Sequence, residues 1–265
     1  MKKILLFFSI ILFLSACTGN QKTYYISMPN FKSTFEEHNN TNANSPKVKI
    51  NDVEIIKNTF YSSYFEQSTL NQRINKSLEL LKKQLLEDSK ALLQSKGYII
   101  DNENPDYAFN IVINASLYED KVTRNSSLGG DSVESSFMII LEAQSHLNNL
   151  HQEDTFQSTT SSAKLNDPII LNYPIKGQAS IESFREVYSA VPTQVNESLA
   201  ASALEIDKVF VAFYKETTSG LKTSIKEIKE EPKTQENSEV QDTKQDDKKE
   251  EKATPYQNNE VIIFE

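Results

Sequence analysis

Apolar residues alternate with polar ones in the middle of the chain, which is the pattern of strands that bury one face. Residues 107–117 carry apolar side chains at every odd position, and residues 137–143 repeat the pattern. Residues 48–60 are rich in Val and Ile and predict one or two further strands. After the second alternating stretch, Asn148-Asn149 is typical of a two-residue turn, so we expect a hairpin there.

A helical spacing of apolar residues occurs on both sides of these strands. The first such segment begins with Thr69-Leu70-Asn71-Gln72, which matches a capping box, and it ends at Gly97. The second begins at Thr193 and ends at Gly220. Between the strands and this helix, residues 164–192 contain three prolines and predict an irregular connection. The order of elements predicts an α+β fold in which two long helices cover a mostly antiparallel sheet.

Composition sets the limits of this domain, which we place at residues 48–220. Residues 17–47 are polar and rich in turn-forming residues, which predicts a disordered tether. Residues 221–265 are dominated by Lys, Glu, Gln and Asp, which predicts a disordered charged tail. The tail ends in the short apolar run Val261-Ile262-Ile263-Phe264. That run either has no specific role or adds a strand to a sheet edge, in this protein or in a partner.

The amino-terminal residues have the features of a bacterial lipoprotein signal. Lys2 and Lys3 precede an apolar run at residues 4–14, which is too short to span a bilayer. The run leads into Leu14-Ser15-Ala16-Cys17, which resembles a lipobox, so we expect residues 1–16 to be a signal peptide. The resemblance implies that Cys17 carries the acyl chains, palmitate among them, and anchors the protein in a membrane. Thr18 follows in place of an Asp, which favours the outer membrane.

Charge and motif content narrow the function further. The chain has 28 basic and 37 acidic residues and a net charge of −9, which becomes −11 when two lysines leave with the signal peptide. This acidity argues against nucleic acid as a partner. The single Cys is assigned to the lipid, and the sequence contains neither a Gly-x-Ser-x-Gly elbow nor a His-Glu-x-x-His motif. We therefore expect a protein that is not an enzyme and that needs no cofactor.

A candidate ligand site follows the strand at residues 107–118. Lys121, Thr123 and Arg124 lie there, in what we expect to be a loop. Two cations beside a hydroxyl group could pair with the carboxylate and hydroxyl groups of an acidic sugar. The alternative is a solvated loop that binds nothing.

Two further candidates involve histidine and asparagine. In a hairpin that turns at residues 148–149, His146 lies opposite His151, and the two rings could share a metal ion. The alternative is that both rings are solvated and that no metal binds. Asn39 starts an Asn-x-Thr sequence with Glu37 two positions before it, which is the extended acceptor pattern of bacterial N-glycosylation.

Three stretches also carry a resemblance to a known family. They are Gln94-Ser95-Lys96-Gly97-Tyr98, residues 140–145 with Asp154-Thr155-Phe156, and the final helix with Ser202-Ala203-Leu204 and Ile206-Asp207. Together they resemble the neuraminyllactose-binding haemagglutinin family, which are adhesin lipoproteins of the Helicobacter type. The resemblance runs from about Val53 to Lys215.

The resemblance has a consequence for the ligand site. The family's proposed sialyllactose-binding motif is the basic run Lys-Arg-Thr-Ile-Gln-Lys-Lys. The same place in this chain begins with Glu119-Asp120, and only Lys121, Thr123 and Arg124 match the motif.

The resemblance implies an outer-membrane binding protein of the adhesin type, with host glycans as partners. The alternative is a periplasm-facing structural or assembly lipoprotein that binds envelope proteins. A homodimer is the third kind of partner that we consider.

Overall fold

The computed structural model describes most of the predicted domain and part of the expected tether. The described residues are 23–33, 35, 41–127, 130–152, 155–175 and 193–228. They all belong to one compact unit, Met1–Lys229. A second unit, Glu230–Glu265, lies wholly outside the described residues, and so does the apolar carboxyl terminus.

The elements follow one another from strand to helix to a long hairpin and back to a helix. In chain order they are β1 (Thr23–Tyr25), β2 (Lys47–Ile50), β3 (Glu54–Phe60), α2 (Ser63–Glu66), α3 (Thr69–Ser95), β4 (Ile99–Ile100), β5 (Tyr107–Ser127), β6 (Gly130–Asn149), β7 (Thr155–Lys164), β8 (Ile169–Pro174), β9 (Gln194–Asn196), the short 3₁₀ helix η2 (Glu197–Leu199) and α5 (Ala200–Ser224).

The long β5–β6 hairpin is the centre of the main sheet. On one side, β2 and then β3 pair with successive parts of β5, and β4 pairs with β2. On the other side, β7 and then β8 pair with successive parts of β6. The pairs made by β6 are antiparallel, whereas β2 and β3 run parallel to β5. The prediction of mixed helix and sheet is confirmed, and the parallel pairs arise because α3 is a crossover between β3 and β5.

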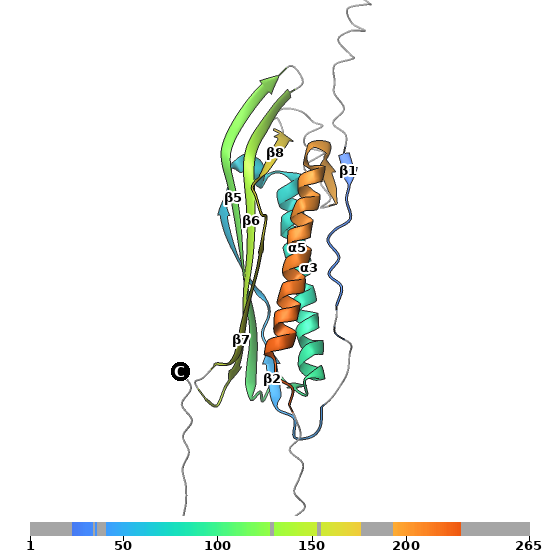
Figure 1. Ribbon diagram of the computed structural model, residues 1–265, viewed down its shortest axis with the longest axis vertical. Coiled ribbons are helices and arrows are strands. Elements are labelled where there is room, and N and C mark those ends of the chain that lie inside the picture. Colours follow the sequence, from blue (N-terminus) through green and yellow to red (C-terminus); the bar gives the residue numbers. More distant parts are fainter. Residues whose placement is uncertain are drawn as a thin grey trace, which may run out of the picture. The chain divides into compact units, whose positions relative to one another are not determined.

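One face of this sheet is buried by the helices. Figure 1 shows α3 and α5 lying side by side on the same side of the β5–β6 hairpin. The odd-numbered residues from 109 to 117 on β5 and from 133 to 147 on β6 point toward the helices and are buried, as the alternation predicts. The largest fully buried side chains are Arg73, Tyr98, Phe65, Phe109, Phe137, Phe210, Phe213, Leu70, Ile74, Leu81, Leu85 and Leu92.

The first residue of α3 differs by one position from the sequence prediction, whereas its carboxyl end agrees with the prediction. The N-cap is Ser68, whose hydroxyl accepts a hydrogen bond from the Asn71 backbone N–H at 3.1 Å, and not Thr69. Both residues can cap a helix, so the sequence alone does not decide between them. Gly97 follows the last turn with φ of 92°, a left-handed conformation that favours glycine, as predicted.

The last helix begins later and ends later than predicted. Residues from Thr193 onward first form β9 and η2, and α5 then continues past Gly220 to Ser224. Leu221 and Ile225 are buried, so the folded chain extends beyond residue 220. Gly220 has a packing role here, because a Cβ at this position would lie 3.0 Å from the hydroxyl of Thr159 on β7.

Two connections after β6 also differ from prediction. The hairpin between β6 and β7 does not turn at residues 148–149, because β6 runs through Asn149 and β7 begins at Thr155. Residues 169–174 form β8, although we expected an irregular connection there. Pro174 lies at the last position of this edge strand, where the missing N–H is tolerated.

Part of the expected tether is packed onto the domain. β1 pairs antiparallel with β9, and Phe31 is buried with its ring 5.3 Å from that of Tyr214. Arg73, which is 1% exposed, binds the carbonyl oxygens of Ile26 and Ser27 at 2.8 and 2.5 Å. Within the predicted tether, residues 23–33 are therefore ordered against the domain, and aromatic residues such as Phe31 make the contacts.

Candidate binding surfaces

The predicted ligand residues lie in β5 and not in a loop. β5 continues to Ser127, and a β-bulge separates Asp120 from Thr123. At this bulge Lys121 has φ of 52°, and the Thr123 hydroxyl lies 3.4 Å from the Lys121 carbonyl oxygen, with which it hydrogen-bonds. Residues 120–126 of β5 are exposed at odd and even positions alike, so the strand shows no alternation there, which is why the sequence suggested a loop.

The charge of Arg124 is already paired within the protein. Its guanidinium forms an ion pair with Asp131 on β6, and this hydrogen bond holds the pKa of the Asp131 carboxyl below its usual range. The side chain of Tyr64 also interacts with this guanidinium. Lys121, Thr123 and Arg124 line neither the pocket beside Tyr64 and Tyr173 nor the groove along the exposed side of α5.

A carboxylate just before the bulge binds three elements together. Glu119 accepts hydrogen bonds from the Tyr173 hydroxyl at 2.6 Å, the Ser135 hydroxyl at 2.7 Å and the Ser62 backbone N–H at 2.8 Å. Burial raises the pKa of Tyr173 above its ordinary value, and the hydrogen bond to the Glu119 carboxylate adds to the rise. All of these partners are internal, so the cluster fixes α2 and β8 to the hairpin.

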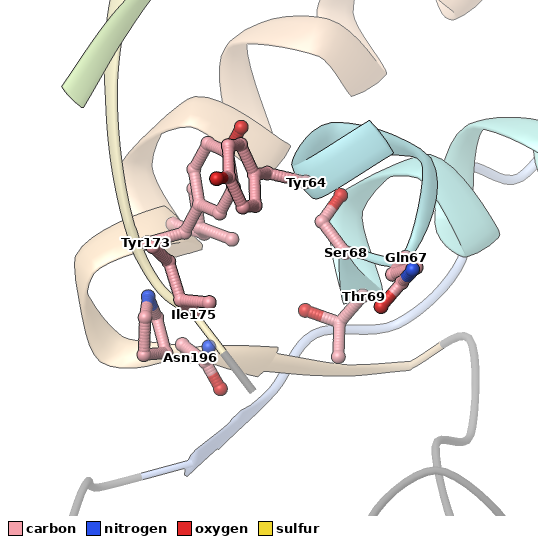
Figure 2. Close-up of a pocket in the computed structure, with 9 residues that line it drawn as sticks. Tyr64, Gln67, Ser68, Thr69, Tyr173, Ile175 and Asn196 are labelled. Atoms are coloured by element: carbon pink, nitrogen blue, oxygen red, sulfur yellow. The ribbon is translucent and has the colours of Figure 1, made fainter. Parts of the chain in front are cut away.

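A small pocket lies beside this cluster (Figure 2). Its volume of about 30 Å³ is enough for a water molecule and too small for a sugar ring. Thr69 is 9% exposed, and its hydroxyl has no hydrogen-bond partner in the described part of the chain. We interpret the pocket as a water site under that hydroxyl. The residues that line it are Tyr64, Gln67, Ser68, Thr69, Tyr173, Pro174, Ile175, Asn196 and Leu199.

The structure does not bring the two candidate metal ligands, His146 and His151, face to face. His146 on β6 lies opposite Ser158, and His151 lies in the turn before β7. The His151 ring instead lies 3.4 Å from a carboxylate oxygen of Asp106. Among the described residues, no three His, Cys, Asp or Glu side chains come close enough to hold a metal ion.

Cys17 and Asn39 lie outside the described residues, so the structure does not bear on either prediction. Among the described helices, none combines the length and the hydrophobicity that a membrane span requires.

The most distinctive surface is on the sheet face that no described helix covers. We call it the exposed sheet patch and define it by Ile56, Phe60, Tyr118, Met138 and Ile170. Phe60 is 60% exposed and Ile170 is 65% exposed. Soluble monomers rarely leave large apolar side chains next to one another in this way unless the surface binds something.

Strand register places these residues next to one another. Phe60 on β3 lies opposite Tyr118 on β5, which in turn lies opposite Met138 on β6. The rings of Phe60 and Tyr118 are stacked, with centroids 5.2 Å apart and planes 4° apart. Ile56 lies four residues before Phe60 on the same face of β3. On the other side of the hairpin, Ile170 on β8 lies opposite Ser136, which is two residues from Met138 on β6. The patch therefore crosses four strands.

Acidic side chains surround the exposed sheet patch. Four exposed carboxylates occur on the same face of these strands, and Lys164 lies on this face of the neighbouring strand β7. At neutral pH this rim attracts cations and repels a surface of its own kind. The carboxylates are Glu54, Asp120, Glu134 and Glu142.

The exposed sheet patch does not follow from the sequence pattern alone. Tyr118, Met138 and the other members occupy the positions that a half-buried strand gives to polar residues. The sequence does contain one sign of the patch: near Tyr118 and Met138, apolar residues occur at both odd and even positions of the same strand. It can be interpreted only when the neighbouring strands and their register are known.

Comparison with known protein families identifies a lipid attachment site at the amino terminus. Residues 1–18 match the family model of a prokaryotic membrane lipoprotein lipid attachment site. The chain is thus a membrane-anchored lipoprotein. Among curated proteins, no sequence matches the chain.

Several solved structures, all of them distant, are similar to parts of the chain. A protein described as a neuraminyllactose-binding hemagglutinin homolog from Helicobacter pylori is 15% identical, covering 73% of this chain and 99% of its own, with a TM-score of 0.32. A minor lipoprotein from Acinetobacter baumannii is 11% identical, covering 68% and 92%, with a TM-score of 0.23. A lipoprotein from Neisseria meningitidis is 8% identical, covering 54% and 94%, with a TM-score of 0.24.

Proposed function

We propose that this lipoprotein acts by binding and not by catalysis, and that the exposed sheet patch is the surface on which it docks another protein of the cell envelope. The observation that supports this proposal is the exposure of Phe60 and Ile170 on a sheet face that no described helix covers. Each such side chain contributes about 1.5–3 kcal/mol when it is transferred from water into an apolar contact. That free energy is available only to a partner.

The partner we propose is a protein segment with apolar side chains and flanking Lys or Arg residues. The apolar part fits the stacked rings of Phe60 and Tyr118, and the basic part fits the acidic rim. A second copy of this chain is a poorer fit, because a two-fold dimer through the patch would bring the same acidic rim against itself. The net charge of −9 adds to that repulsion.

A double variant tests the docking surface directly. Phe60→Ser with Ile170→Ser removes two apolar contacts and should lower recovery of one identified partner at least about tenfold, which corresponds to about 1.4 kcal/mol. The matched control is Gln144→Ala with Thr160→Ala, which lie opposite each other on the same face outside the patch. Equal recovery with both variants would contradict the proposal.

Glycan binding by an adhesin is the second candidate function, and the exposed positions of Lys121, Thr123 and Arg124 near the end of the hairpin favour it. Lys121→Ala with Arg124→Ala should then reduce binding of the chain to sialylated glycans on an array. Because Arg124 is paired with Asp131, Asp131→Asn provides the control that frees the cation and should raise binding. Unchanged binding in both variants would exclude this site.

We place the protein in the outer membrane, and the two candidate functions require opposite faces of it. The turn between β6 and β7 offers a reporter position, because Leu150 is 51% exposed. In a chain whose only cysteine is acylated, Leu150→Cys introduces a single free thiol. Labelling by a membrane-impermeant maleimide in intact cells would favour the adhesin. Labelling only after permeabilisation would favour a periplasmic assembly role.

A further inference from the structure

The distance between the lipid and the folded domain is short. Cys17, the residue that the lipid attachment site assigns to the acyl chains, precedes Thr23 by six residues, and Thr23 is the first residue of β1. Six extended residues reach at most about 20 Å. The end of the domain that carries β1 is therefore held close to the membrane surface.

That end cannot move away by unpeeling β1, because the segment is fixed in two ways. The first is a ladder in which Thr23, Tyr24 and Tyr25 pair with β9, whose central residue Val195 is fully buried. The second is Arg73, which lies behind the segment and binds the carbonyl oxygens of Ile26 and Ser27.

Arg73 itself is held by α5. Its guanidinium forms a salt bridge with Asp207 at 2.5 Å, so one buried cation joins the amino-terminal segment, α3 and α5. Burial raises the pKa of Asp207, while the Arg73 guanidinium opposes the shift. We call this group of contacts the Arg73 clasp. Releasing the segment would break the hydrogen bonds from this buried guanidinium to the carbonyl oxygens of Ile26 and Ser27, while the salt bridge to Asp207 would remain; losing hydrogen bonds to a buried charged group is costly.

The fixed strand presents two aromatic side chains to solvent. Tyr25 is 75% exposed and Tyr24 is 46% exposed. The Tyr25 hydroxyl accepts a hydrogen bond from the side-chain amide of Gln194 on β9 at 3.1 Å. The Tyr24 hydroxyl donates one to the carboxylate of Glu197 on η2 at 3.4 Å. An apolar ring with a polar tip is the chemistry that partitions into the headgroup region of a bilayer.

We infer that the β1–β9 ribbon is a membrane-contact surface, with the ring of Tyr25, which points away from the face of the buried Val195, at the level of the lipid headgroups. The inference rests on acylation of Cys17 and is independent of docking at the exposed sheet patch. Because neither β1 nor β9 contains a charged side chain, contact through the ribbon depends on aromatic partitioning more than on attraction to anionic lipid. Its dependence on salt is therefore weak.

Tryptophan fluorescence tests this contact, because the chain contains no Trp. Tyr25→Trp places a single reporter on the ribbon of the full acylated chain, reconstituted in phosphatidylethanolamine and phosphatidylglycerol vesicles. Leu150→Trp, at the turn between β6 and β7, is the matched control, because Leu150 is also exposed. Brominated lipids should quench the reporter at position 25 several-fold more strongly than the one at position 150. Equal quenching would overturn the inference.

A second variant tests the short link. About 30 Gly/Ser residues inserted before Thr23 add a flexible spacer of about 30 Å. Quenching of the reporter at position 25 should then fall to the level of the control, while circular dichroism stays unchanged. Quenching that persists with the spacer would show that the link does not hold the ribbon at the membrane, and would overturn that step of the inference.

Discussion

The two faces of the central sheet are built from alternate residues of the same strands, yet they serve different purposes. On β6, Phe137 and Leu141 point toward the helices and are fully buried, whereas Met138 and Glu142 point the other way. The helix side is mostly apolar and stabilises the fold. The opposite side mixes carboxylates with a compact group of exposed apolar side chains. Folding explains the apolar residues on the helix side, whereas the group of apolar residues on the other side is the basis of the docking proposal.

The sharpest test of this comparison is to remove one ring from each face. Phe137→Ala deletes a fully buried ring that lies 4.7 Å from Phe65, and should lower the free energy of unfolding by about 3–5 kcal/mol. Phe60→Ala should change it by less than about 1 kcal/mol, because the side chain is largely solvated. Urea unfolding followed by circular dichroism measures both. Similar losses would mean that the two faces do not differ as described.

The Arg73 clasp is the polar counterpart of this core. Arg73→Met leaves Asp207 without its cation and frees two carbonyl oxygens, so unfolding free energy should fall by about 3 kcal/mol. The control is Lys76→Met on the exposed side of α3, where the salt bridge to Glu79 contributes at most about 0.5 kcal/mol. A variant as stable as the control would show that the clasp does not hold the amino-terminal segment.

A smaller effect is expected at high pH on the helix-covered side. Burial raises the pKa of Tyr98 to about 12, and its hydroxyl has no hydrogen-bond partner in the described part of the chain. The folded protein keeps this proton above pH 10, where the unfolded chain loses it, so stability falls as the pH rises from about 10 through about 12. Tyr98→Phe should reduce that loss by about 1–2 kcal/mol and cost little at pH 7.

The measurement is urea unfolding of the wild type and Tyr98→Phe at pH 8 and pH 11. An equal loss of stability between the two pH values in both proteins would assign the alkaline sensitivity to other groups.

The sequence predicted the elements better than their connections. Alternation located β5 and β6 because their odd residues, such as Phe109 and Leu141, are buried by helices along most of their length. It did not locate the end of β5 near Arg124, where both sides of the strand are solvated. Likewise, Asn148-Asn149 has the composition of a turn, but pairing of Asn148 with Thr155 extends the strand past it.

The candidate site was harder to predict for the same reason. Lys121 and Arg124 are visible in the sequence as charges, but the ion pair that occupies Arg124 depends on Asp131 of the neighbouring strand. Phe60 and Ile170 are far apart in the chain and lie on one face only through the register of β3, β5, β6 and β8. Pairing between distant strands is the information that a local pattern does not contain.

Photo-crosslinking in intact cells tests the docking proposal most directly. A photoreactive residue replaces Tyr118 in the exposed sheet patch, and in a matched chain it replaces Lys83, which is 75% exposed on α3. The account predicts an adduct with one other protein from position 118 and none from position 83. It also predicts that Glu134→Lys with Glu142→Lys abolishes the adduct. No adduct at position 118, or an adduct there with lipid or with a second copy of this chain, would contradict the account.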